Sequence, residues 1–237
     1  MIAHRGEGPA FEPLLQRLNG PEPMRAAFEW FVAAEHGELA VLDNLCIAAA
    51  EAEGTDHDRD EFAVVRTLAA EYRGDPGIAI SVLLNHVRLS AGEALYLPAG
   101  NIHAYLRGIG IELMASSDNV LRGGLTPKHV DVAELMSVLD FGSMPVPYLH
   151  PDRQPGLDLY RPEEAPLALA RVTGPVELQP DGPAIVLCAN GPVTVTGSLA
   201  SQVLGRGEST LVTADEGVLR FTGSGDVWVA AAGLRAS

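Results

Sequence analysis

The sequence is poor in cysteine, in basic residues and in long apolar runs. Only two of its 237 residues are cysteines, Cys46 and Cys188, and they lie far apart in apolar surroundings. We expect two buried free thiols in a reducing compartment rather than a disulfide framework. No apolar run approaches the roughly 18–20 residues that span a bilayer, and the N-terminus has no apolar signal core. These absences predict a cytoplasmic protein, and a length of 237 residues allows one large domain or two small ones.

Basic residues are few and unevenly placed. The 16 basic side chains face 31 acidic ones, for a formal net charge of −15. Without a net positive field the chain has nothing to attract nucleic acid or an anionic membrane, so we exclude both as partners. Residues 78–130 differ, with four basic and three acidic side chains, and they contain Lys128, the only lysine in the chain. An anionic ligand would be least repelled in that stretch.

Residues 11–73 have apolar side chains at the three- and four-residue spacing of amphipathic helices. One helical stretch is predicted from Met24 to Ala52 and is divided in two at Gly37. Another runs from Asp58 to Arg73 and ends at the turn residues that follow. A separate short helix is predicted at Val130–Leu139. The first of these helices would form an acidic lobe whose apolar stripe is its core.

After Gly77 the sequence changes to short apolar segments separated by glycine, proline and asparagine, which predicts β-strands. Four strands are expected in the middle of the chain: Ile80–Leu89, Glu93–Leu97, Ile102–Leu106 and Gly110–Ala115. A proline-rich passage, Pro145–Pro166, reads as a linker and an edge. Seven further strands are expected beyond it: Leu167–Val172, Ala184–Cys188, Val193–Val195, Gln202–Leu204, Ser209–Val212, Val218–Phe221 and Val227–Ala231. Their spacing suits a sandwich or barrel.

A four-residue motif occurs in both halves of this β region. Ser90-Ala91-Gly92-Glu93 is echoed by Gly205-Arg206-Gly207-Glu208, and each copy precedes a short apolar strand. The echo suggests two related jelly rolls, of which the second has no cluster of metal-ligating residues.

The segment from Gly100 to Ala115 predicts a hairpin, because Gly108-Ile109 suits a tight type II′ turn. Side chains alternate between the faces of a strand, so His103, Tyr105 and Glu112 would share one face. Burying these three polar groups is unfavourable unless they have partners. Metal binding is one use, with a neutral histidine nitrogen as ligand. The carboxylate could be a second ligand, a hydrogen-bond partner of a ligand, or a base. A half-exposed sheet face with ordinary polar residues is the alternative, and spacing alone leaves both open.

The hairpin leads into a polar, glycine-rich loop from Ser116 to Lys128, which brings Asp118 and Arg122 close to its exit. An arginine and a lysine in one loop can clamp a phosphate or neutralise an oxyanion. Loops often carry such residues, so the pattern by itself is weak.

Four blocks of this region agree in order, spacing and identity with one known family. They are Ser90-Ala91-Gly92-Glu93-Ala94-Leu95-Tyr96-Leu97-Pro98-Ala99, His103-Ala104-Tyr105-Leu106, Ile111-Glu112-Leu113-Met114-Ala115 and Ser117-Asp118-Asn119-Val120-Leu121-Arg122-Gly123-Gly124-Leu125-Thr126-Pro127-Lys128. They closely resemble type I mannose-6-phosphate isomerases of the cupin class, and the match is dense over residues 82–140. The resemblance implies a mainly β fold of cupin-type jelly rolls with an N-terminal α-helical lobe. Its expected parts are a helical lobe (1–77), the C-terminal part of an incomplete catalytic cupin (78–145), and a linker with a C-terminal cupin-like domain (146–237).

The resemblance also implies a reaction and a set of roles. Members of the family interconvert mannose 6-phosphate and fructose 6-phosphate by proton transfer through a cis-enediol, with a zinc ion held by a glutamine, two histidines and a glutamate. His103 matches the last of these zinc ligands. Arg122 matches the catalytic arginine, Lys128 a lysine on the phosphate side, and Tyr105, Glu112 and Asp118 further active-site positions. Glu112 is our candidate for proton transfer, with Asp118 as its competitor, and Tyr105 for substrate binding.

The chain departs from the family at the other zinc ligands. The Gln-x-His and Lys-Pro-Glu motifs that supply them occur nowhere in the sequence. Because tight zinc binding needs several converging donors, we expect the chain alone to be inactive or nearly so, and to be completed by a missing N-terminal segment or a second chain. Alternatives are a non-catalytic cupin that binds a sugar phosphate as a sensor or regulatory module, and a remnant that binds no ligand.

Overall fold

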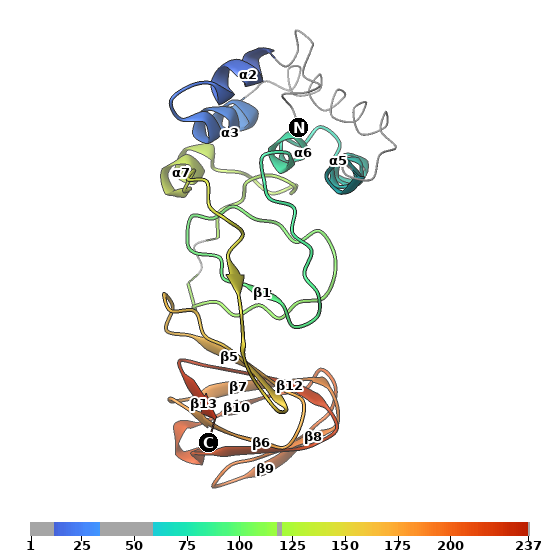
Figure 1. Cartoon of the computed structure of the whole chain (residues 1–237), viewed down its shortest axis with the longest axis vertical. Helices are drawn as coiled ribbons and strands as arrows, with labels where there is room; N and C mark the ends of the chain where they lie inside the picture. Colours follow the sequence, from blue (N-terminus) through green and yellow to red (C-terminus); the bar gives the residue numbers. More distant parts are fainter. Residues whose placement is uncertain (1–11, 34–58, 118–119, 237) are drawn as a thin grey trace. The chain divides into compact units, whose positions relative to one another are not determined.

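A computed structural model describes residues 12–33, 59–117 and 120–236. The chain divides into two compact units (Figure 1). The first comprises Met1–Arg88, Leu97–Leu106 and Asn119–Val146, and the second comprises Leu89–Tyr96, Arg107–Asp118 and Pro147–Ser237. The three-part division expected from the sequence stays a prediction.

The first unit is built on helices. Those described are α2 (Glu12–Leu18), α3 (Pro23–Ala33), α5 (Arg59–Glu71), α6 (Gly77–Ser81) and α7 (Val132–Val138). Helix α3 confirms the start of the helical stretch predicted from Met24. Helix α5 confirms the stretch predicted at Asp58–Arg73, and α7 the short helix predicted at Val130–Leu139. The remainder of the Met24–Ala52 prediction, with the division at Gly37, lies outside the described residues.

Two apolar clusters hold these helices together. The larger one joins α2, α3, α6 and α7 through the following buried residues: Leu14, Ala27, Phe28, Phe31, Ala79, Ile80, Leu135 and Met136. The smaller one joins α5 to α6 through Val65, Leu68, Ala69 and Ile78. Helix α7 starts where its apolar positions begin, because the Asp131 side chain accepts a hydrogen bond from the backbone N–H of Glu134 (3.0 Å).

The second unit contains a β-sandwich with two antiparallel sheets (Figure 1). The six-stranded sheet has the order β10-β7-β12-β5-β4-β3, and the five-stranded sheet the order β13-β6-β11-β8-β9. The strands are β3 (Asp152–Gln154), β4 (Leu157–Tyr160), β5 (Ala168–Val172), β6 (Val176–Pro180), β7 (Ala184–Asn190), β8 (Val193–Thr196), β9 (Ser201–Leu204), β10 (Ser209–Val212), β11 (Leu219–Gly223), β12 (Asp226–Ala231) and β13 (Leu234–Ala236). All seven strands predicted after Pro166 are confirmed.

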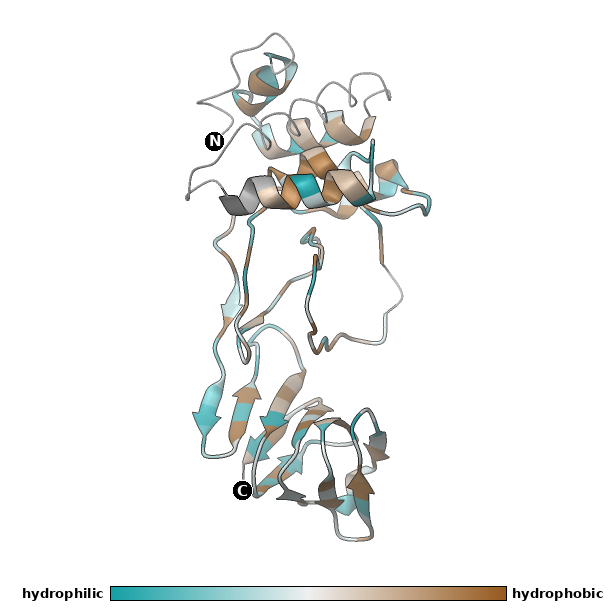
Figure 2. Cartoon of the chain, turned by 90° about the vertical axis from the view of Figure 1, so that its right-hand side faces the viewer, coloured by the Kyte–Doolittle hydropathy of each residue, from teal (hydrophilic) through white to brown (hydrophobic). Residues whose placement is uncertain are grey.

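Alternation of side chains fills the space between the two sheets. Every second residue is buried along β5 and β8, and hydrophilic and hydrophobic bands follow one another on the strands in Figure 2. The shared core includes Leu178, Leu204, Leu219, Phe221 and Val229. This pattern of one buried and one outward face is what a sandwich requires.

Four strands of the sandwich were not predicted. Strands β3 and β4 lie inside the passage that we read as a linker, although β3 is indeed an edge strand. They form a hairpin whose turn is Pro155-Gly156, with Gly156 at φ +76°, and this Pro-Gly pair is the signal that could have revealed it. Strand β6 ends in a proline, and β13 has three residues, so neither shows a clear strand pattern.

The strands predicted in the middle of the chain are largely wrong. Helix α6 occupies the start of Ile80–Leu89; its residues are all buried, and a buried helical turn has the same apolar run as a buried strand. Only Ala94–Leu95 (β1) of the second predicted strand pairs, with Tyr148–Leu149 (β2). No strand is assigned between residues 97 and 117, so neither arm of the predicted hairpin forms a ladder.

The segment of the predicted hairpin is largely exposed. Tyr105 is 72% exposed and Ile109 100% exposed. An isolated two-stranded hairpin is marginal in water, and the described residues supply no further strand beside it. Gly108 does have the positive φ (+116°) expected of the turn.

The repeated four-residue motif has the same local structure twice. In the first copy the Glu93 carboxylate accepts from the N–H of Ser90 (2.7 Å), and Gly92 has φ +87°. In the second copy Glu208 accepts from Gly205 (2.7 Å), and Gly207 has φ +82°. Glycine in the third position permits the turn, and the glutamate closes it, so the echo in the sequence is an echo of structure.

Cys188 is a free, buried thiol, as predicted, whereas Cys46 lies outside the described residues. Burial raises the pKa of the Cys188 thiol above its ordinary value. Among the described helices none combines the length and apolar composition that a membrane crossing needs.

The sandwich core can be tested with two leucines on different sides of the sheets. Leu219 is 1% exposed and Leu211 is 69% exposed. Leu219→Ala should lower the free energy of unfolding by about 2–5 kcal/mol because it leaves a cavity, whereas Leu211→Ala should change it by less than about 0.5 kcal/mol. Urea unfolding followed by Trp228 fluorescence in a Trp30→Phe background measures both. Equal losses would contradict the assigned faces.

A second test uses the Cys188 thiol. Because its folded pKa is raised, the native state holds the proton more tightly than the unfolded state. The resulting stabilisation is present at neutral pH and is lost as the pH rises past the unfolded pKa and through the folded one. The wild-type free energy of unfolding should therefore fall more between neutral and alkaline pH than that of Cys188→Ala. Identical pH dependence of the two proteins would refute the burial of an ionisable thiol here.

Candidate functional site

His103 is anchored in the first unit by the residues that precede it. Gly100 accepts a backbone hydrogen bond from Asp140 (3.0 Å), and a side chain at Gly100 would lie 2.8 Å from the carbonyl oxygen of Val138. The Asn101 side chain contacts the sulfur of Met144 (3.2 Å). These contacts fix the course of the chain into His103 in the absence of a strand.

The His103 ring has a defined hydrogen bond. Its Nδ1 lies 3.0 Å from the carbonyl oxygen of Asn101, and since a carbonyl can only accept, Nδ1 carries the proton. The neutral ring then presents Nε2 as an unprotonated nitrogen, which is the form that binds a metal. Spacing did not reveal the part played by Asn101, because the contact is made by its main chain.

The structure brings His103 and Tyr105 together. Their ring centroids are 5.8 Å apart at an interplanar angle of 72°, an edge-to-face contact. Both side chains are exposed. The predicted neighbourhood of an imidazole and a phenol is therefore found, whereas the position of Glu112 on the same face stays a prediction. Glu112 belongs to the second unit, and Asp118 lies outside the described residues.

Arg122 and Lys128 are exposed residues of one loop in the first unit. Gly123 packs so closely against Ile102 that an added Cβ would lie 2.6 Å from its Cδ1. The neighbour of Arg122 thus touches the neighbour of His103. At the other end, the backbone N–H of Lys128 donates to the Thr126 hydroxyl (3.2 Å). A cationic loop therefore lies beside the segment that carries the imidazole.

The residues described do not by themselves form a metal centre. His103 fits one coordination bond through Nε2, but no group of three or more His, Cys, Asp or Glu side chains gathers within the ranges that the structure covers. A zinc site takes four ligands, or three and a water. The described residues therefore bring fewer donors together than such a site needs.

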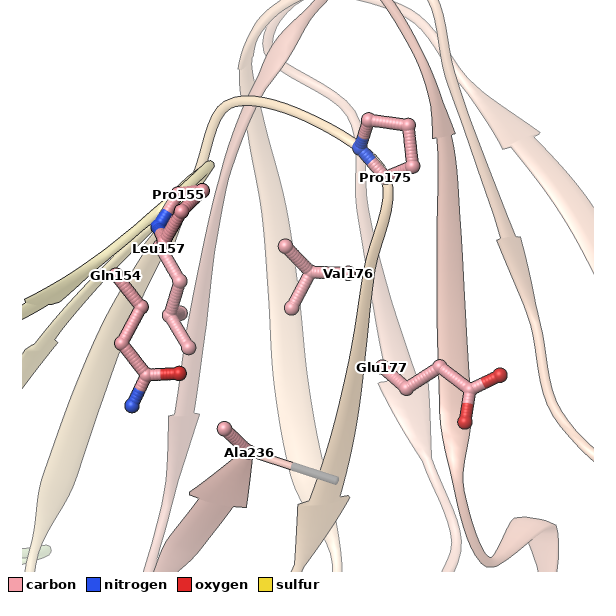
Figure 3. A pocket seen from close by; sticks show the side chains of 7 residues that line it. All are labelled: Gln154, Pro155, Leu157, Pro175, Val176, Glu177 and Ala236. Atoms are coloured by element: carbon pink, nitrogen blue, oxygen red, sulfur yellow. The ribbon is translucent and has the colours of Figure 1, made fainter.

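The second unit contains a separate cavity of about 210 Å³ (Figure 3). Its lining residues are Gln154, Pro155, Leu157, Pro175, Val176, Glu177 and Ala236. None of them is a predicted site residue, and the Glu177 carboxylate is paired with Arg220 at 2.7 Å. The cavity therefore offers little converging polar chemistry.

Comparison with known proteins identifies relatives by sequence. Mannose-6-phosphate isomerase of Escherichia coli (strain K12) is 34% identical over 172 residues, which are 70% of this chain and 44% of the relative. Mannose-6-phosphate isomerase 2 of Arabidopsis thaliana is 35% identical over 173 residues, 69% of this chain and 38% of the relative. The chain thus spans less than half the length of these curated relatives. No family model matches it.

Solved structures agree with the sequence relatives. A variant of phosphomannose isomerase from Salmonella typhimurium superimposes with a TM-score of 0.82 at 27% identity, covering 95% of this chain and 58% of that one. The apo form of mannose 6-phosphate isomerase from the same organism gives a TM-score of 0.80 at 27% identity, with 94% and 57% covered.

The fold is therefore the mainly β fold of the cupin class, with an N-terminal α-helical lobe, as predicted. Within that class the chain is a homologue of the mannose-6-phosphate isomerases and corresponds to part of their length. The family resemblance seen in the sequence is confirmed.

The geometry of His103 makes a direct prediction about its proton. Long-range ¹H–¹⁵N correlation at mildly alkaline pH should show Nδ1 protonated and Nε2 bare, because the Asn101 carbonyl holds the Nδ1 proton. His129, also in the first unit, is the control ring in the same spectrum. A His103 ring with its proton on Nε2 would rule out the orientation described.

Proposed function

We propose that the chain is part of a mannose-6-phosphate isomerase, which interconverts mannose 6-phosphate and fructose 6-phosphate by proton transfer through a cis-enediol. The observation that carries the proposal is the similarity to mannose-6-phosphate isomerases over 70% of the chain. The neighbourhood of His103, Tyr105 and the Arg122–Lys128 loop in the first unit supports it. We further propose that the complete protein works in the cytoplasm.

Each side chain has a role that its chemistry allows. Lys128 would neutralise the phosphate, and Tyr105 would donate a hydrogen bond to a sugar hydroxyl. Arg122 stays charged and would stabilise the oxyanion of the enediolate, but it cannot serve as a base. Glu112 would move the proton between C1 and C2, with Asp118 as the competing candidate.

His103 would supply one ligand to a zinc ion through Nε2. When bound, the metal supplies Lewis acidity that polarises the sugar oxygens. The other donors would come from outside the described residues, from a preceding segment or from a second chain. We therefore propose that the chain alone has little or no isomerase activity and gains it only when these donors are supplied.

A ligand-induced rise in melting temperature tests the anion site without requiring turnover. Mannose 6-phosphate at 100 times its Kd should stabilise the chain by about 2.7 kcal/mol. Arg122→Ala and Lys128→Ala should each weaken binding by about 10- to 100-fold, since a hydrogen bond to a charged group contributes about 1.5–3 kcal/mol. Arg161→Ala, an exposed arginine of the second unit, is the matched control, and mannose without phosphate should not bind.

The same assay with and without zinc, run on the chain together with the segment or second chain that supplies the other donors, separates the two leading functions. A response to the sugar phosphate that grows with zinc favours the isomerase, whereas a full response without metal favours a non-catalytic sugar-phosphate sensor. No response from the wild-type chain would reject an anion site formed by this chain alone. Clear zinc-dependent isomerase activity of the purified chain would overturn the proposed incompleteness.

A further inference from the structure

The loop that carries Arg122 and Lys128 contains an unusual backbone conformation at its centre. Leu125, three residues from each cation, has φ +53°. Among the described residues other than glycine, it alone lies in the left-handed region. A leucine rarely adopts this conformation unless its surroundings impose it. The contacts that impose it are therefore part of what places the two cations.

A single carboxylate makes the polar contact. Asp75 Oδ1 accepts from the backbone N–H of Leu125 (2.9 Å) and from that of Gly77 (2.7 Å). Asp75 lies between α5 and α6, fifty residues before Leu125 in the sequence. Its main chain is held as well, because its N–H donates to Tyr72 and its carbonyl accepts from Ile78. The Asp75 carboxylate is thus held in place by the helices, and its hydrogen bond to Leu125 holds the loop.

Two glycines let the loop come this close. A Cβ on Gly77 would lie 2.6 Å from the Leu125 side chain, and one on Gly124 would lie 3.0 Å from Asp75 Oδ1. The Leu125 side chain then packs against the cluster of α5 and α6 that includes Val65 and Ile78. The loop is therefore held to the helices by the Asp75 carboxylate and by the packing of the Leu125 side chain.

We propose that Asp75 is a positioning residue for the anion-binding loop. Its carboxylate holds Leu125 in the left-handed conformation, and this conformation fixes the course of the chain between Arg122 and Lys128. Asp75 touches no substrate in this scheme; it raises sugar-phosphate affinity by keeping the loop in its binding-competent form. The role in binding rests on the proposed function, whereas the role in ordering the loop does not.

The test compares two aspartates, each of which makes the same kind of local hydrogen bond. Asp75 and Asp140 each accept from the N–H of a glycine two residues on, at 2.7 and 2.8 Å, but the bond to Leu125 belongs to Asp75. Asp75→Ala is compared with Asp140→Ala. Asp75→Asn is the conservative variant, because its amide oxygen still accepts but more weakly than a carboxylate.

Hydrogen–deuterium exchange of peptides covering residues 120–130 reads the loop directly. Asp75→Ala should exchange at least about tenfold faster there, Asp75→Asn should be intermediate, and Asp140→Ala should match the wild type. Mannose 6-phosphate binding, measured by calorimetry with inorganic phosphate as a second probe, should weaken by about tenfold in Asp75→Ala if the competent form falls to a tenth of the population.

Two results would overturn the proposal. One is unchanged exchange at residues 120–130 in Asp75→Ala. The other is faster exchange spread evenly over α3, α5 and α7 with no excess in the loop, which would mean that Asp75 only holds the fold. If the wild-type chain binds neither probe, the proposed function of the loop fails, while faster exchange confined to the loop would still support Asp75 as its anchor.

Discussion

A strand is stable only when neighbours satisfy its backbone and cover its apolar face, and this constraint decides where the chain is regular. In the sandwich of the second unit, β5, β7 and β12 have partners on both sides. The segment from residue 97 to 117 has none among the described residues, although its composition is just as suitable for strands. There Tyr105 and Ile109 remain exposed, and position is fixed by a few local contacts instead of a ladder.

Those local contacts are concentrated in the first unit. There the residues beside the candidate site pack against helices and not against a sheet. Ile102 packs into the cluster of α2, α3, α6 and α7 and meets Gly123. Leu125 packs into the cluster of α5 and α6. His103 is thus one residue from an apolar anchor, and Arg122 and Lys128 are each three residues from one, so the backbone is held while these polar side chains lie at the surface.

The sequence was informative wherever one element decides its own structure. Helical periodicity predicted α5, and Asp131 caps α7 where the periodic pattern begins. Short apolar segments separated by turn residues predicted the strands after Pro166. The same criterion failed at α6, whose residues are all buried, and a proline-rich composition was wrongly interpreted as a linker at β3 and β4, where Pro155-Gly156 makes a hairpin turn. The contact of Asp75 with Leu125 left no pattern at all, because residues fifty positions apart share it.

What the sequence by itself determined is the family, the strands after Pro166 and the identity of the cationic loop, since these follow from residue types and their spacing. The tertiary structure decided which of these residues meet. A main-chain carbonyl determines which nitrogen of His103 carries the proton. The Asp75 carboxylate, distant in sequence, holds the cationic loop, and the predicted hairpin has no strand pairing. Each of these depends on groups that packing brings close together. The bonds to the main chain of Asn101 and Leu125 could not be predicted from the sequence, because every residue has the same main-chain groups.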